Sequence, residues 1–342
     1  MTNILEIKNL YTQFFTQGRV IKAVDGVSYD VEEGETLAVV GESGCGKSVT
    51  ALSVMGLIPW PPGKVTAGEV IFQGQPLWKW VGKGKKRKMI MDAEKMRSIR
   101  GKEISMVFQE PMTSLNPVLS IGRQLTETIE SHMEITQKQA LVRAAEVMIQ
   151  VGISEPERRL SQYPHQFSGG MRQRVMIAMA LICNPKLILA DEPTTALDVT
   201  IQAQILALMK DLSKDYGAAM ILITHNLGVV ARYADRVNVM YAGQIIEQST
   251  AEEIYGNPKH PYTLGLLNSV PRLDEKVKQR LEPIEGQPPD LGAEFIGCRF
   301  RPRCRFGDPD TCGKEDPPLQ EVLPGHWTAC FKHAEVFKAV PN

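Results

Sequence analysis

The chain has 342 residues and a mass of 38.0 kDa. This is more than one hydrophobic core usually serves, so we expect a main domain of about 250 residues with an appended part. Hydrophobic residues make up 43% of the chain and charged residues 23%, which excludes a disordered, collagen-like or coiled-coil protein. Lys and Arg together number 39, as do Asp and Glu, so a charged ligand must be held by local groups rather than by an overall field.

Nothing in the sequence predicts a membrane span or a secretion signal. The longest apolar run, Val175 to Cys183, is nine residues, about half of the roughly 20 that a spanning helix needs. The N-terminal segment has neither the basic region nor the long apolar region of a signal peptide. We therefore expect a cytosolic chain that does not cross a membrane.

The N-terminal part alternates apolar and polar residues, which predicts antiparallel strands. We expect them over residues 5–8, 20–31 and 36–40, with a second hairpin at 68–74. A glycine-rich loop and a helix over 48–56 lie between, and the proline-rich stretch 59–63 ends that helix. Five of the six residues 83–88 are basic. A solvated loop is the expected structure for this run, and binding to anionic lipid or nucleic acid is the alternative.

The middle of the chain is predicted to be helical and its later part to contain buried strands. Apolar residues recur at helical spacing from Gln137 to Val151, and Gly152 is a stop signal. The short apolar runs 187–190 and 220–223 are typical of parallel strands that are buried on both faces. Beyond Pro258 the composition shifts toward Pro, Arg, Asp and Cys, so we place a domain boundary near 257 and expect a tail with little core of its own.

Residues 41–48 read G-E-S-G-C-G-K-S and fit the phosphate-loop pattern G-x-x-x-x-G-K-[ST] between a predicted strand and a predicted helix. Glycines let backbone N–H groups approach phosphate oxygens, Lys47 reaches the outer phosphates, and the Ser48 hydroxyl can bind Mg²⁺. A chance turn is the alternative, and Cys45 is expected to be a small filler. The candidate nucleotide-binding residues here are Gly41, Ser43, Gly44, Cys45, Gly46, Lys47, Ser48 and Val49.

Two carboxylates follow the first buried strand. Asp191 and Glu192 stand at its carboxyl end, the edge at which open α/β sheets bind ligands. Asp191 is the candidate Mg²⁺ ligand, directly or through water, and Glu192 is the candidate base that orients the attacking water. Without the phosphate loop, a helix-capping acidic pair would be a serious alternative.

The segment Ser168-Gly169-Gly170 looks like a second phosphate cradle. Ser168 can cap the following helix, and the two glycines offer bare N–H groups at its N-terminus. One nucleotide hardly needs two cradles, so we expect the second to close over a nucleotide bound to a partner subunit. A glycine-rich turn between helices is the alternative.

With these motifs in order, residues 3–256 resemble an ATP-binding subunit of an ABC transporter. The resemblance implies that residues 41–48 are the Walker A loop, Ser168-Gly169-Gly170 the signature, and Asp191 and Glu192 the Walker B and catalytic carboxylates. It adds Gln109 as the Q-loop residue and Mg²⁺ contact, Asp198 as the D-loop residue, and His225 as the switch histidine that donates to the γ-phosphate. Met171 departs from the Gln that the family often has.

The resemblance also implies a fold and partners. The fold is α/β, a P-loop NTPase core of ABC type with an antiparallel β subdomain and a helical subdomain at about 112–180, all within residues 1–256. The partners would be a second ATP-binding subunit, identical or related, two membrane permeases and, indirectly, an extracytoplasmic solute-binding protein. The chain would be peripheral on the cytoplasmic face of the membrane. Phe14 would stack on adenine, with Tyr11 and Phe15 as alternatives.

The tail, residues 257–342, resembles over 257–332 the C-terminal extension of dipeptide, oligopeptide and nickel importer ATPases, which implies a cargo of one of these kinds. Its four cysteines, Cys298, Cys304, Cys312 and Cys330, are separated by five, seven and seventeen residues, which is neither zinc-ribbon nor ferredoxin spacing. Four thiolates suit Zn²⁺ or an iron–sulfur cluster, and the resemblance favours a structural [4Fe–4S] cluster. Unliganded thiols are the third possibility, and His326 and His333 are candidates to replace one sulfur.

The sequence therefore predicts an ATPase that powers peptide import. The competing hypothesis is a soluble ABC-type ATPase that acts on nucleic acid or ribosomes. Such proteins carry a coiled-coil insertion or two cassettes, whereas this chain has one cassette with about 120 residues between its two phosphate cradles. Glu192 and His225 argue against a third hypothesis, a nucleotide-binding module without turnover.

Overall fold

The computed structural model describes residues 2–82, 84, 88–195, 197–269 and 284–337. Contacts within the chain divide it into two units. Unit 1 comprises residues 1–4, 31–36 and 91–223, and unit 2 comprises residues 5–30, 37–90 and 224–342.

The strands of unit 1 are parallel and buried. They are β8 (Ile104–Val107), β9 (Leu187–Asp191) and β10 (Ala219–Thr224), with β9 paired to both neighbours. Every residue of β9 and β10 is buried, because both faces are covered, and this is why their sequences are continuous apolar runs without alternation. The prediction of parallel strands at 187–190 and 220–223 is confirmed.

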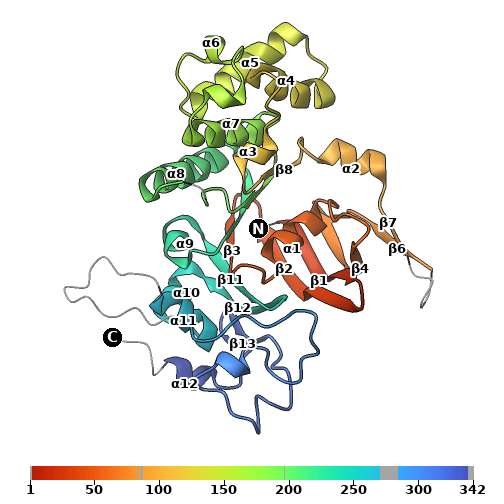
Figure 1. Cartoon of the computed structure of the whole chain (residues 1–342), viewed down its shortest axis with the longest axis vertical. Coiled ribbons are helices and arrows are strands. Elements are labelled where there is room, and N and C mark those ends of the chain that lie inside the picture. Colours follow the sequence, from red (N-terminus) through yellow and green to blue (C-terminus); the bar gives the residue numbers. More distant parts are fainter. Residues whose placement is uncertain (1, 83, 85–87, 196, 270–283, 338–342) are drawn as a thin grey trace, which may run out of the picture. The chain divides into compact units, whose positions relative to one another are not determined.

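Helices make up most of the rest of unit 1. They are α2 (Ala93–Ile99), α3 (Pro111–Ser114), α4 (Ile121–His132), α5 (Gln137–Gln150), α6 (Pro156–Arg159), the 3₁₀ turn η2 (Pro164–Gln166), α7 (Gly169–Leu181) and α8 (Val199–Tyr216). Helices α4, α5 and α7 pack on one another (Figure 1). Helix α5 begins at a capping box of Thr136 and Gln139, and Gly152 follows it with a φ of 76°. The predicted helix and its stop are confirmed.

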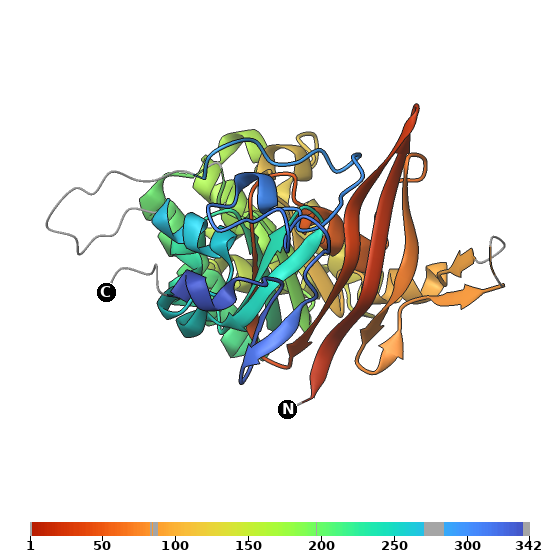
Figure 2. The same cartoon turned by 90° about the horizontal axis from the view of Figure 1, so that it is seen from below.

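Unit 2 begins with an antiparallel sheet that confirms the β-rich start. Its strands are β1 (Asn3–Thr16), β2 (Arg19–Glu32), β4 (Gly63–Phe72) and β5 (Gln75–Pro76), in the order β2-β1-β4-β5. Figure 2 shows the long strands side by side in red and orange. A small hairpin of β6 (Lys79–Val81) and β7 (Lys88–Ile90) follows. Of the basic run 83–88, residues 83 and 85–87 lie outside the described residues.

A second set of strands in unit 2 includes the C-terminal segment. The order is β13 (Gln320–Leu323), β14 (His326–Thr328), β12 (Gln244–Thr250), β11 (Arg236–Tyr241), β3 (Thr36–Val40). Strand β14 pairs antiparallel with β12, so the tail extends a sheet that the main part of the chain begins. The helical segments of this unit are α1 (Lys47–Val54), α9 (Leu227–Tyr233), α10 (Ala251–Gly256), α11 (Pro261–Asn268), η3 (Arg301–Arg303) and α12 (His333–Phe337).

Aromatic residues of the tail pack into a core that the main part of the chain supplies. Tyr262 and Phe300 are buried in one cluster with Tyr241 of β11, and the ring centroids lie 4.7 Å apart for Tyr241 and Tyr262 and 5.2 Å apart for Tyr241 and Phe300. The buried tail residues therefore join a core that the main part of the chain supplies, which agrees with our expectation of a tail with little core of its own. The aromatic residues come from separated loops and meet only in three dimensions, so no periodicity in the sequence reveals them.

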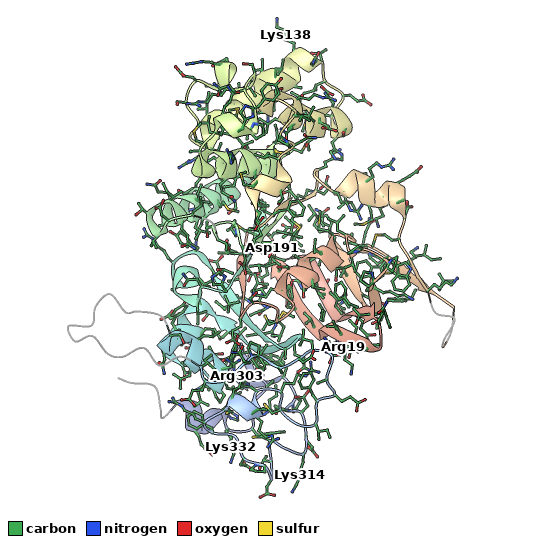
Figure 3. The ribbon with its side chains drawn as sticks, in the orientation of Figure 1. Arg19, Lys138, Asp191, Arg303, Lys314 and Lys332 are labelled. Carbon is green, nitrogen blue, oxygen red and sulfur yellow. The ribbon has the colours of Figure 1, made fainter. Side chains whose placement is uncertain are left out.

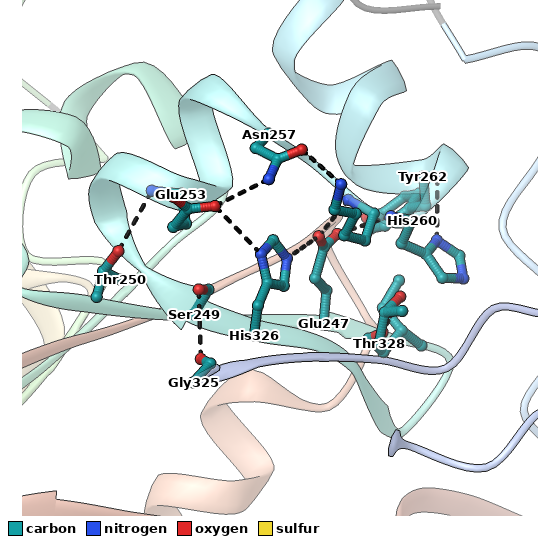
Figure 4. Close-up of polar contacts among 12 residues, drawn as sticks. Glu247, Ser249, Thr250, Glu253, Asn257, His260, Tyr262, Gly325, His326 and Thr328 are labelled. Carbon is teal, nitrogen blue, oxygen red and sulfur yellow. Dashed lines mark hydrogen bonds and ion pairs between the residues drawn. The ribbon is translucent and has the colours of Figure 1, made fainter. Parts of the chain in front are cut away.

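A buried carboxylate also ties the tail to the sheet (Figure 4). Glu247 of β12 is fully buried and accepts hydrogen bonds from the backbone N–H groups of Lys259, at 2.5 Å, and His260, at 3.0 Å. The Nε2 atom of His326, in β14, lies 2.8 Å from Glu247 Oε1. One side chain thus joins three segments of unit 2.

Within the described ranges, no helix is both long enough and apolar enough to cross a bilayer.

We predict that Glu247→Ala lowers the free energy of unfolding by about 3–5 kcal/mol, because it leaves buried donors without an acceptor. Urea denaturation followed by circular dichroism measures this loss. The control is Glu253→Ala, since the Glu253 side chain is 47% exposed and lies 3.6 Å from His326 Nδ1; this change is expected to cost less than about 1 kcal/mol. Equal losses in the two variants would contradict the role of Glu247.

Candidate functional site

The predicted phosphate loop lies between β3 and α1 in unit 2. Gly46 precedes the helix in a left-handed conformation, with a φ of 108°. The Lys47 side chain is almost fully buried, and its Nζ donates to the carbonyl oxygens of Gly41, at 2.7 Å, and Glu42, at 2.9 Å. The loop therefore folds around the ammonium group, which is the strand, loop and helix arrangement that the pattern requires.

Two glycines of this loop have no room for a side chain. A Cβ on Gly46 would lie 2.2 Å from the Ala23 carbonyl oxygen, and one on Gly41 would lie 2.2 Å from that of Met240. The backbone itself thus packs against its neighbours at both ends of the loop. Cys45 is buried, and burial raises the pKa of its thiol, as expected for a small filler.

In unit 1, the two predicted carboxylates stand where β9 ends. Asp191 is the last, buried residue of the strand (Figure 3), and Glu192 follows with a φ of 45°. The Glu192 backbone N–H donates to the Ile223 carbonyl at 2.9 Å, which holds this unusual conformation in place. Its Oε2 accepts hydrogen bonds from Gln109 Nε2, at 3.1 Å, and from Thr195 Oγ1, at 2.9 Å. The structure therefore brings Gln109 and Glu192 together.

The predicted signature segment, Ser168-Gly169-Gly170, forms the N-terminus of α7, and no side chain covers it at Gly169. Ser168 caps α7, since its Oγ accepts from the Met171 N–H at 3.3 Å, and the predicted cap is confirmed. Ser168 and Gly169 are exposed, and a Cβ on Gly169 would meet no atom within 4 Å. Asp198 caps α8 in the same way, with its Oδ1 accepting from the Ile201 N–H at 3.0 Å. Both segments are exposed on unit 1.

The remaining nucleotide-site candidates lie in unit 2. His225 is exposed and directly follows β10. Phe14 is half-buried in β1, opposite Gly63 of β4, where an added Cβ would lie 2.7 Å from the ring. Of the two alternatives to Phe14, Tyr11 is half-buried and Phe15 is exposed, with its edge toward Trp60.

The four tail cysteines line one cavity. The Cys298 N–H donates to the Cys312 carbonyl at 2.8 Å, and all four sulfurs are free of disulfides. Burial raises the pKa of Cys298 to about 11 and that of Cys330 to about 12, so both thiols are neutral at pH 7. Across the described part of the chain, no group of three or more His, Cys, Asp or Glu side chains is placed to hold a metal ion.

The two histidines considered as substitutes for a sulfur are not among the residues that line this cavity. His326 is directed to Glu247, and the Nδ1 atom of His333 lies 3.1 Å from the Cys330 carbonyl oxygen. The cavity therefore offers sulfur ligands and neither of these imidazoles.

Sequence reasoning missed the partners of the second loop residue, Glu42. Its carboxylate is held by Arg303 of η3 and its N–H by the Tyr262 hydroxyl of α11, both from the tail. One signal in the sequence was available. A carboxylate within an anion-binding loop requires a cation to neutralise it.

Two family models match this chain. A family model described as ABC transporter matches residues 24–195. The chain belongs to the ABC transporter family of ATP-binding proteins. A second model, described as oligopeptide/dipeptide transporter, C-terminal region, matches residues 246–312. As a member of this family, the chain binds and hydrolyses ATP, and its core is the P-loop cassette.

Individual relatives cover the chain almost completely. The oligopeptide transport ATP-binding protein OppD of Bacillus subtilis is 50% identical over 100% of this chain and 92% of its own length. The dipeptide transport ATP-binding protein DppD of the same organism is 52% identical over 89% of this chain and 87% of its own. A solved dimer of the ATP-binding cassette MJ0796 with ADP and Pi matches with a TM-score of 0.61 and 27% identity, over 72% of this chain and 98% of that one.

We predict that Gly46→Ala weakens ATP binding at least about tenfold, because the new Cβ meets the Ala23 carbonyl and displaces the loop. Titration with a fluorescent ATP analogue measures the affinity. Gly34→Ala is the matched control, since Gly34 also has a positive φ, 74°, but a Cβ there meets no atom within 4 Å. Equal affinity in the two variants would refute the steric argument.

Proposed function

We propose that this chain is the ATP-hydrolysing subunit of an importer for dipeptides or oligopeptides. The observation that carries the proposal is the extent of the match: relatives named as peptide transport proteins are similar over the main part and the tail alike. The tail itself matches the C-terminal region of oligopeptide and dipeptide transporters. The competing function, action on nucleic acid or ribosomes, has no counterpart among these relatives.

In this proposal, the loop of residues 41–48, with Val49 after it, binds the phosphates of ATP. Its backbone N–H groups and the Lys47 ammonium supply positive charge to the phosphate oxygens. Ser48, Asp191 and Gln109 supply the oxygen ligands that Mg²⁺ prefers, and the bound ion neutralises charge on the phosphates. Phe14 provides a face for adenine. The buried position of Lys47 inside the loop supports this assignment.

Glu192 is assigned as the residue that orients and deprotonates the attacking water, and His225 as a donor to the terminal phosphate. Support for Glu192 comes from its geometry, because Gln109 and Thr195 both hold the same carboxylate oxygen. A carboxylate held at two points loses rotational freedom, which favours a fixed position for the water. The 3.1 Å hydrogen bond from Gln109 would also link the proposed Q-loop residue directly to the proposed catalytic carboxylate.

We further propose that two ATP-binding subunits, identical or related, enclose ATP between Lys47 of one and the Ser168-Gly169-Gly170 segment of the other, with Asp198 at the same interface. The exposed, bare start of α7 supports this, as does the dimeric state named for the MJ0796 cassette. Two unit charges 4 Å apart attract by about 1 kcal/mol in water and about 4 kcal/mol at an effective dielectric of 20. Enclosure of the nucleotide therefore strengthens the dimer, and hydrolysis weakens it.

The dimer would act on two membrane permeases from the cytoplasmic face of the membrane, with a solute-binding protein as an indirect partner. The segment after Gln109 is the proposed contact. Met112 and Val118 of this segment are 67% and 75% exposed, and Phe108, directly before Gln109, is 41% exposed. A partner that covers these side chains would connect the Q-loop to the transport pathway.

Glu192→Gln is expected to retain ATP binding and to lower the rate of hydrolysis by about 10²–10⁴-fold, because the amide does not accept the proton. Phosphate release measures turnover. Light scattering with ATP, alone and with a related ATP-binding subunit, is expected to show a dimer. Glu157→Gln, at an exposed carboxylate of α6, serves as the control. Unchanged turnover in Glu192→Gln would overturn the assignment, and a monomer in every mixture would overturn the enclosed dimer.

For the tail, we propose that Cys298, Cys304, Cys312 and Cys330 hold a [4Fe–4S] cluster, with Zn²⁺ as the alternative ligand. The support for this proposal is that the four cysteines line one cavity and that thiolate is a ligand both groups take, although the side chains as they stand in the described residues form no group placed to hold a metal ion. When bound, the group would crosslink the loops that carry the cysteines. Thiols with raised pKa values must lose protons on binding, so ligand affinity would depend on pH and contribute to folding.

Protein purified without oxygen is expected to be brown and to contain iron and sulfide, or to contain zinc if the alternative holds. Absorbance spectra and elemental analysis distinguish these results. Cys304→Ser is expected to lose the bound group and to unfold at a lower temperature. Cys183→Ser keeps it, since Cys183 belongs to unit 1. A colourless protein without stoichiometric metal would eliminate this proposal.

A further inference from the structure

An acidic residue occupies the second position of the phosphate loop. Glu42 belongs to the same eight-residue segment as Lys47, and its side chain is 26% exposed. Like charges about 4 Å apart repel by roughly 4 kcal/mol at an effective dielectric of 20. An uncompensated carboxylate here would oppose the binding of a polyanion such as ATP.

Arg303 of η3 neutralises this carboxylate. Its Nη1 lies 2.7 Å from Glu42 Oε2 and its Nη2 lies 2.9 Å from Glu42 Oε1, so both oxygens are engaged in a bidentate pair. The Arg303 side chain is only 5% exposed, so solvent screens the pair weakly. Hydrogen bonding to Glu42 raises the pKa of the guanidinium, so Arg303 is permanently charged. Figure 3 labels Arg303 among the side chains of unit 2.

Other contacts hold the Arg303 side chain in this orientation. Its Nε donates to the Glu285 carbonyl at 3.0 Å, and its guanidinium lies 5.9 Å from the ring centroid of Tyr241 and 6.0 Å from that of Phe300. Contacts other than Glu42 therefore hold the Arg303 side chain in this orientation.

Tyr262 of α11 holds the backbone at the same residue. Its hydroxyl oxygen accepts a hydrogen bond from the Glu42 N–H at 2.8 Å. The Tyr262 side chain is fully buried, and burial raises its pKa, so the hydroxyl stays neutral. The Tyr262 N–H in turn donates to His260 Nδ1 at 3.1 Å, and burial lowers the pKa of His260 to about 3, which keeps this acceptor available at pH 7.

Three polar groups of Glu42 thus have protein partners: its N–H bonds to Tyr262, its carbonyl to Lys47 and its carboxylate to Arg303. Two of the three partners come from the tail. The conformation and the charge of the loop at this residue are therefore set by a segment more than 200 residues away, since Tyr262 and Arg303 lie 220 and 261 positions from Glu42.

We infer that Arg303 and Tyr262 are positioning residues for ATP, and that the C-terminal extension keeps the phosphate loop competent by neutralising and orienting Glu42. The inference rests on the proposed assignment of residues 41–48 as the phosphate-binding loop. It gives the extension a role in nucleotide affinity, in addition to any role in cargo or metal binding.

The test compares the full-length variants Arg303→Gln and Arg303→Lys with Arg299→Gln. Arg299 is a matched control, because it is a buried tail arginine, 9% exposed, that pairs with Asp25 and donates to the Ala242 carbonyl. We expect Arg303→Gln to raise the dissociation constant for ATP about tenfold or more, with a smaller increase for Arg303→Lys, which keeps the charge but loses the bidentate geometry. Arg299→Gln is expected to change the affinity less than about twofold.

A second comparison shows whether weaker ATP binding comes from the unpaired charge on Glu42 or from a disturbed fold. In Glu42→Gln/Arg303→Gln no uncompensated carboxylate remains, so ATP affinity is expected to return to within about threefold of wild type. Tyr262→Phe keeps the buried ring but removes the acceptor for the Glu42 N–H, and a severalfold loss of affinity is expected. In steady-state hydrolysis, Arg303→Gln is expected to raise KM for ATP more than it lowers kcat.

Arg303→Gln that binds ATP as tightly as Arg299→Gln would overturn the inference, and so would a loss that Glu42→Gln does not rescue. If Arg303→Gln does not fold, Arg303→Lys and Tyr262→Phe decide by the same comparison with the control. Lys47→Ala tests separately whether residues 41–48 bind the phosphates. Unchanged ATP binding in Lys47→Ala would overturn the assignment of the loop itself, whereas lost binding there with normal binding in Arg303→Gln would overturn only the role of the tail.

Discussion

In the proposed assignment, the structure depends on one electrostatic constraint: a strongly anionic ligand must be held by a loop that offers mostly backbone groups. The loop has little freedom to meet this demand, because Gly41 and Gly46 already press against neighbouring carbonyl groups. The cation comes from Lys47, which is buried among loop carbonyls rather than directed into solvent. A single misplaced negative charge in such a site outweighs several neutral hydrogen bonds.

This constraint explains why the C-terminal extension is joined so closely to unit 2. Strand β14 pairs with β12, Glu247 ties the start of α11 to both, and aromatic rings from the tail complete the core around Tyr241. Each contact fixes the segments that carry Tyr262 and Arg303. The extension is therefore part of the framework that holds the phosphate loop, even though its composition differs from that of the main part.

Much of the fold and the site was predictable because the signals are local. The helix at α5, the buried strands β9 and β10 and the Ser168 cap each follow from a few neighbouring residues. The phosphate loop is equally local, since its glycines, Lys47 and Ser48 all lie within eight consecutive residues. The pairing of Glu42 with Arg303 and the core that the tail joins connect residues far apart in the chain, and no period or spacing encodes them. Glu42, the acidic residue in the loop, was the only feature of the sequence that pointed to a cationic partner.

The position of Arg303 connects the two roles assigned to the extension. The turn η3 (Arg301–Arg303) lies between Cys298 and Cys304 in the chain. It is flanked by Phe300 in the aromatic core on one side and by Cys304 at the sulfur-lined cavity on the other. Arg303 is adjacent to Cys304 in the chain, so the proposed ligand of the cysteines and the proposed positioning residue for ATP would lie on neighbouring residues. The cysteine cavity and the phosphate loop are thus linked through a single short turn.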